Sequence, residues 1–170
     1  MTLTTISIIV ATCIYVVYNA ISVAFFDTPE SLSHTYYLWK ERSNKGWLFP
    51  LMMYAVVAFM MPAWITLSEG SDFQFLAFLA PSAIAFVGTA PAFKSDDLEN
   101  VVHTTAAIVA AICSLAWVAV ITPYWWMILI WLCSITCLAV LTSSYKSCLV
   151  YWLETIAFGA TFTSAILYSI

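Results

Sequence analysis

The sequence predicts an all-α, polytopic integral membrane protein: a bundle of six transmembrane helices that forms a single domain over residues 1–170. Hydrophobic residues make up 64% of its 170 residues and charged residues only 8%, whereas soluble domains carry roughly a quarter charged residues. Apolar runs of about 20 residues, the length that crosses a bilayer, recur along the chain. Backbone in lipid must satisfy its own hydrogen bonds, and these runs lack the alternation of barrel strands, so they predict helices.

Six apolar runs are separated by polar, glycine-containing or proline-containing breaks. Glycine and charge interrupt the chain at 68–72, charge at 94–100 and a proline at 122–124. The break at 142–147 is the least pronounced, so five spans with one long bent helix are an alternative. The first run has no positive leader and no small-residue cleavage site, and we interpret it as a span rather than a signal peptide. The predicted spans are 3–26, 47–68, 73–93, 100–121, 123–143 and 147–169.

The positive charges predict the orientation of the bundle. The chain has only five lysine and arginine residues, and they fall in alternate loops: Lys40, Arg42 and Lys45 in the first, Lys94 in the third and Lys146 in the fifth. Cytoplasmic loops retain positive charge, so both termini are expected outside. So few cations cannot follow a phosphate backbone, which excludes a nucleic-acid partner. We expect a cell membrane location, the inner membrane in a bacterium, with membrane lipids as partners.

The first loop is the only long one, and it predicts a short interfacial helix over about 29–42. Thr28 suits an N-cap, Pro29 the first helical position and Glu30 the positive end of the helix dipole. The aromatic residues of this helix would lie near the lipid headgroups on the cytoplasmic side.

Polar residues gather at the start of the fourth predicted span. Asp96 and Asp97 are placed to cap the helix at its positive dipole end. Glu99 and His103 lie one turn apart, deeper in the helix, and share a face with small residues that allow close helix packing. This small-residue stripe consists of Ala107, Ala110 and Ser114.

Two other spans carry a strongly polar residue at a depth similar to that of His103: Asn19 in the first and Glu154 in the sixth. A polar or ionisable group in hydrocarbon is costly, so it normally faces a partner or a wet cavity. We therefore expect Asn19, His103 and Glu154 to define a polar pocket open to the cytoplasm, with the first loop as its roof. The residues predicted to contact a ligand there are Asn19, Asp27, His34 and Asp97.

The predicted catalytic residues are Glu99, His103 and Glu154. Glu99 and His103 can act as an acid/base pair, with Glu154 as a second carboxylate. The alternative interpretation is that this pair forms a structural hydrogen-bond node between helices. Since the chain has only two histidines, a divalent metal ion would need a mixed site of His34, His103 and a carboxylate such as Glu99. The cysteines lie in or beside apolar runs and are predicted to be free thiols.

The run VGTAPAFKSDDLENVVHTTAA, residues 87–107, combines a glycine and a proline at the end of one span with a short polar loop and a His-x-x-x-Ala start to the next. Through Gly88, Pro91, His103 and Ala107 it resembles small six-span membrane proteins of the DRAM-like, GPI-remodelling-associated group and related bacterial families. The sequence SLSHTYY after the first span is a second point of similarity. The resemblance implies the six-span layout and singles out His103 as a residue of functional importance, but it implies no particular reaction.

Three functions are consistent with these features. The first is a membrane protein whose pocket takes a lipid or small amphiphile and acts on it through the Glu/His pair or a metal ion. The second is a transporter or channel-like ligand-binding protein that uses the same pocket, with a homo-oligomer needed for alternating access. The third is a structural or accessory subunit of a membrane complex, in which the small-residue stripe packs against a partner.

Overall fold

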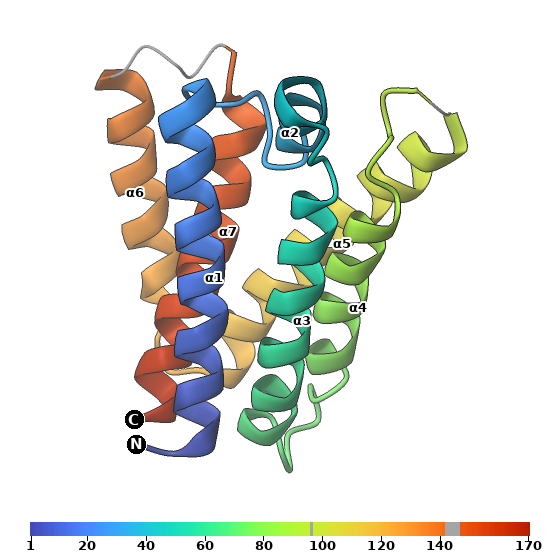
Figure 1. Ribbon diagram of the computed structural model, residues 1–170. Helices are drawn as coiled ribbons and strands as arrows, with labels where there is room; N and C mark the ends of the chain where they lie inside the picture. The colour runs from blue at the N-terminus through green and yellow to red at the C-terminus, as the bar shows by residue number, and fades with distance from the viewer. Residues whose placement is uncertain (96, 142–146) are drawn as a thin grey trace.

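The computed structural model describes residues 1–95, 97–141 and 147–170, and all the regular structure in these ranges is α-helical. Figure 1 shows long helices that run up and down the molecule, with both termini at one end and the short helix α2 at the other. We refer to the latter as the α2 end. The helices are α1 (Leu3–Phe26), α2 (Thr35–Ser43), α3 (Leu48–Leu67), α4 (Leu76–Thr89), α5 (Asp97–Ile121), α6 (Trp126–Leu141) and α7 (Leu149–Ser169).

Four of these helices, α1, α3, α5 and α7, are long and apolar enough to cross a membrane. The prediction of an all-α chain is confirmed, and these four helices meet the length and apolarity that a membrane span needs. α4 and α6 fall within the predicted third and fifth spans but are shorter, at 14 and 16 residues. α4 starts late because residues 71–75 form successive turns, in which Gln74 N donates to Ser71 O and Leu76 N to Phe73 O.

The prediction for the first loop is corrected in its boundaries. α2 starts at Thr35 rather than near Pro29, and it ends at Ser43, where Asn44 caps it in the left-handed conformation. The residues before it form tight turns, with His34 N donating to Ser31 O and Thr35 N to Leu32 O. Thr28, the predicted N-cap, instead accepts a hydrogen bond from the Cys148 thiol with its carbonyl. A contact with a distant helix therefore replaces the expected first turn.

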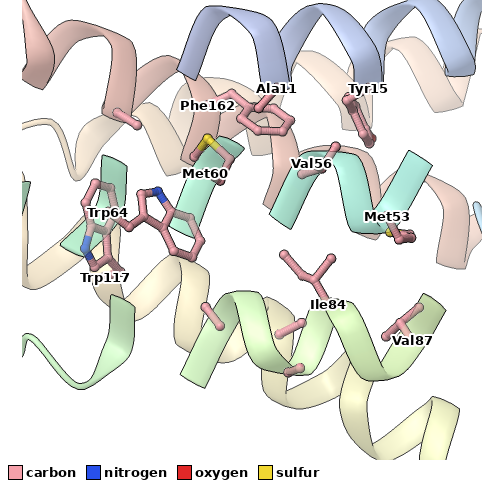
Figure 2. Close-up of a cluster of buried hydrophobic side chains, with 14 of the residues drawn as sticks. Ala11, Tyr15, Met53, Val56, Met60, Trp64, Ile84, Val87, Trp117 and Phe162 are labelled. Atoms are coloured by element: carbon pink, nitrogen blue, oxygen red, sulfur yellow. The ribbon is translucent and has the colours of Figure 1, made fainter. Parts of the chain in front are cut away.

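α7 is the central helix of the bundle. In its most apolar 18-residue window 56% of the residues are buried, compared with 22% in α1. α7 contacts α1, α5 and α6, and α3 packs between α4 on one side and α1 on the other. Figure 2 shows Met53, Val56 and Met60 of α3 in this position, between the side chains of α4 and those of α1 and α7.

α6 lies at the edge of the bundle and packs mainly against α7. The contact is close because the indole of Trp131 lies directly over Gly159. A Cβ atom at Gly159 would come within 2.5 Å of the Trp131 ring. The indole N–H of Trp131 donates to Thr163 Oγ1 at 3.1 Å, which fixes the ring over the glycine. A glycine is required at position 159 because any side chain there would collide with the Trp131 ring.

Gly159→Ala should therefore destabilise the protein by about 1–3 kcal/mol, the usual cost of overpacking a close contact. The measurement is thermal unfolding of the detergent-solubilised protein. Gly88→Ala is the matched control, because its Cβ would lie 3.1 Å from Met53 Cβ and the loss should be smaller. Adding Trp131→Leu to Gly159→Ala should recover part of the stability. A Gly159→Ala variant as stable as the wild type would contradict this description of the α6–α7 contact.

Candidate functional site: a polar cap over an apolar cavity

Glu154, in the second turn of α7, bonds to the first loop rather than to another helix. Its Oε2 accepts a hydrogen bond from Leu32 N at 2.6 Å. The same stretch of loop makes two more contacts with the start of α7: Tyr151 N donates to Glu30 O at 3.1 Å, and the Cys148 thiol to Thr28 O at 3.2 Å. The loop segment 27–34 is thus fastened across the N-terminal end of α7.

Asn19 lies beside this junction, on the neighbouring helix α1. Its side-chain nitrogen donates to Tyr15 O at 2.9 Å, and its carbonyl oxygen accepts from the Tyr151 hydroxyl at 3.3 Å. Tyr151 is also one of the residues that holds the first loop. Asn19 and Glu154 therefore lie in one hydrogen-bonded region, since Tyr151 bonds to Asn19 with its hydroxyl and to the first loop with its N–H.

Glu99 and His103 both hold the connection between α4 and α5. The imidazole Nδ1 of His103 lies 2.9 Å from Ala90 O, and since a carbonyl can only accept, this nitrogen carries the proton. The ring stacks on Phe93, with centroids 4.4 Å apart, and His103 is only 4% exposed. Glu99 Oε2 accepts from Ala92 N at 2.9 Å. Both side chains thus bond to backbone of the segment 90–95 that connects α4 with α5.

The two segments are also joined to each other at the surface. Lys94 Nζ lies 3.0 Å from Glu30 Oε2, and Lys94 N donates to the Tyr37 hydroxyl at 2.7 Å. His34 Nδ1 lies 3.3 Å from the same Glu30 oxygen without hydrogen-bond geometry. We call segments 27–34 and 90–95 together the polar cap. It lies at the α2 end, held from below by Glu154, Glu99 and His103.

The titrating groups of the polar cap respond to one another. The hydrogen bond from Lys94, with the charge of His34, lowers the pKa of Glu30 from its ordinary value. Partial burial, with the positive charge of Lys94, lowers the pKa of His34, although Glu30 and Glu41 act in the opposite direction. Glu30 is therefore charged and His34 neutral over the physiological range of pH.

The other predicted site residues lie outside these contacts. Asp97 is exposed at the first turn of α5, where it faces the positive end of the helix dipole as expected. Asp96 lies outside the described residues. Asp27 is exposed at the end of α1, with φ 60° and ψ −166°, a backbone region that is essentially restricted to glycine. This strained residue marks the point where the chain leaves α1 for the cap.

No group of three or more His, Cys, Asp or Glu side chains suited to a metal ion occurs in the part of the chain that the structure describes. His34 lies in the first loop and His103 contacts the α4–α5 connection, so these two predicted ligands have different partners. The described cysteines are free thiols, as predicted.

Below the polar cap, a narrow cavity runs between α3, α4, α5 and α7. Its volume is about 60 Å³, room for a few water molecules. Along α3 it extends from Met53 to Trp64, which are about 16 Å apart at the rise of an α-helix. Among the described residues that line it, Glu154 is the one ionisable group. Asn19 and His103 do not line it, so the predicted polar pocket is replaced by an apolar cavity with one carboxylate.

The small-residue stripe of α5 supplies one wall of this cavity through Ala107, Ala110 and Ser114. The sequence signal for this wall was present, although it predicted close packing rather than space. The α3 wall, with its methionines, was missed because an entirely apolar helix does not show which side chains face a cavity. Trp64 stacks on Trp117 at 5.2 Å, and its buried indole N–H has no hydrogen-bond partner among the described residues.

No family model matches the chain, and no similar protein was found among curated proteins or solved structures. The resemblance of residues 87–107 to the DRAM-like group therefore stays a sequence-based expectation.

His103→Ala should loosen the segment 90–95, because it removes a buried hydrogen bond and a ring contact. Losing such a bond costs about 1–3 kcal/mol, so local opening should rise about fivefold or more. The measurement is the rate of tryptic cleavage after Lys94 in the solubilised protein, with cleavage at Lys40, Arg42 and Lys45 as the internal reference. Thr104→Ala is the matched control, since this neighbouring side chain is exposed and bonds to Asn100 on the same helix. An unchanged cleavage rate in His103→Ala would argue that the histidine does not hold the cap.

Acidification should destabilise the polar cap. The pKa values of His34 and Glu30 are both lower in the folded protein than their ordinary values of 6.5 and 4.5. The unfolded chain therefore binds protons first as the pH falls, which favours unfolding. The contribution of His34 is complete above pH 6.5 and declines below it, and that of Glu30 declines below pH 4.5. The midpoint of thermal unfolding, measured between pH 8 and pH 4, should fall in these two windows.

Variants separate the two contributions to this pH dependence. His34→Gln should remove the decline that begins below pH 6.5, whereas Glu69→Gln, in the loop at the opposite end of the molecule, should leave the profile unchanged (Figure 1). A His34→Gln profile identical to that of the wild type would show that His34 does not titrate between the folded and unfolded states.

Proposed function

We propose that this protein binds a single-chain amphiphile, with the tail in the cavity between α3, α4, α5 and α7 and the head group at Glu154 beneath the polar cap. The observation that carries the proposal is that Glu154 contacts both the cavity and the polar cap. The same side chain lines the apolar cavity and accepts the hydrogen bond of Leu32 in the cap. A polar ligand group at Glu154 therefore meets both the hydrophobic interior and the segment that closes it.

The shape of the cavity favours a slender chain. At about 60 Å³ it cannot hold a ring system or two acyl chains, and even one alkyl chain requires some side chains to move. Met53 and Met60 line it from α3, and methionine is the apolar side chain that adapts most easily to a new neighbour. Small residues on α5 face them, so movement of the methionines widens the space without moving a helix.

The proposed membrane arrangement has six spans, in which α4 and α6 complete the crossings made by the four longer helices. Both termini lie at the same end in Figure 1, which is consistent with an even number of crossings. The positive charges of Lys40, Arg42 and Lys45 support a cytoplasmic polar cap and external termini. α2 would lie along the cytoplasmic interface, so the ligand would enter from the inner leaflet.

In this proposal Glu99 and His103 position the cap, and neither needs to exchange a proton with the ligand. Their support for it is geometric: each bonds to backbone of segment 90–95, and neither lines the cavity. The proposed role is therefore binding, for carriage or sensing of the amphiphile, rather than chemical conversion.

Ala110→Leu should block the cavity, because Ala110 is buried and lines it. Binding of a neutral probe, dodecyl glycerol ether, should weaken at least about tenfold, or about 1.4 kcal/mol. The measurement is a titration followed by native mass spectrometry of the solubilised protein. Ala119→Leu is the matched control, since it adds the same side chain to an exposed position of the same helix that does not line the cavity. Equal binding by both variants would refute the cavity as the site.

A further inference from the structure

We infer that the ligand of this cavity carries a positively charged head group, so that the protein selects long-chain amines or quaternary ammonium amphiphiles. This inference rests on the proposed function and adds the chemical class of the ligand. It depends on three features of the described residues: the lone carboxylate, the aromatic rings beside it, and the distribution of the cations.

Glu154 is the one carboxyl group among the described residues of an otherwise apolar space, and when ionised it brings negative charge there. It accepts a hydrogen bond from the neutral backbone N–H of Leu32, and the ion pairs of the described residues are made by Glu30, not by Glu154. A carboxylate in the apolar interior of a membrane protein is costly unless its charge is balanced. A cationic ligand would balance it, whereas an anionic one would add a second negative charge at the same place.

The side chains next to Glu154 on the cavity wall are suited to a cation. Glu154, Phe158 and Phe162 follow one another at intervals of four residues, so they share one face of α7, and all three line the cavity. Tyr15 of α1 stacks on Phe158 with centroids 4.5 Å apart, and its ring lies 5.4 Å from that of Phe162. A carboxylate beside a group of aromatic rings is the arrangement that recognises ammonium and quaternary ammonium ions.

The lysine and arginine residues that the structure describes lie away from the cavity. Lys94 pairs with Glu30 at the surface of the cap, Lys40 lies over the ring of Tyr36, and Arg42 over that of Phe25. None of the described lysine and arginine residues lines the cavity. The described chain thus supplies no cation that would attract the carboxylate or phosphate head of an ordinary anionic lipid to this site.

The test compares probes that share one tail and differ in the head group: dodecyltrimethylammonium, neutral dodecyl glycerol ether and dodecanoate, titrated into the wild-type protein in a non-ionic detergent. We expect the cation to bind at least about tenfold more tightly than the neutral probe, because the aromatic rings and the carboxylate both attract a desolvated positive charge. Dodecanoate should bind most weakly. In Glu154→Gln the preference for the cation over the neutral probe should be lost, so that the two probes bind equally tightly.

Glu41→Gln is the control variant, because it removes an exposed carboxylate on α2 and should leave all three affinities unchanged. Equal binding of the cationic and neutral probes by the wild type would overturn the inference and leave the proposed function intact. Retention of the cation preference by Glu154→Gln would also overturn it. Failure of all three probes to bind would refute the proposed function and the inference together. The wild-type comparison decides the question even where the Glu154→Gln variant does not fold.

Discussion

A polar group inside an apolar bundle must be hydrogen-bonded by the chain itself, and the bond between Glu154 and Leu32 N is where this constraint shapes the molecule most. It draws the first loop over the start of α7, and the contacts of Thr28 and Glu30 with the same helix end follow from that position. Because these residues are committed to α7, they cannot also form the first turn of α2, which begins only at Thr35. One half-buried carboxylate thus determines the path of a whole loop.

The connection between α4 and α5, also at the α2 end, shows the same need to satisfy polar groups within the chain. The backbone at Ala90 and Ala92 leaves α4 with polar groups that the helix can no longer satisfy, and His103 and Glu99 supply the missing partners. Glu154, Glu99 and His103 therefore all bond to backbone that lies beyond the ends of helices. Glu154 differs from the others because it reaches the cavity as well as the cap, and this difference gives it a functional role in our proposal.

The sequence predicts properties that depend on local composition. α1 matches its predicted span at both ends, because a run of apolar residues bounded by polar ones defines a membrane helix without help from the rest of the fold. The polar residues at matching depth, Asn19, His103 and Glu154, were identified for the same reason. What composition could not show was which of them share a space. This depends on helix order and rotation, which place Glu154 on the cavity and turn His103 toward Phe93.

The edge position of α6 bears on the order in which the chain is made. Its buried residues are Ile135 and Ala139, and its main packing surface, around Gly159, belongs to the helix synthesised after it. When α6 leaves the ribosome, that surface has not yet been made, so α6 lacks its main packing partner until α7 follows. A nascent chain that ends before α7 therefore contains most residues of the main apolar core, but it lacks the wall that α7 supplies and the carboxylate of the cavity.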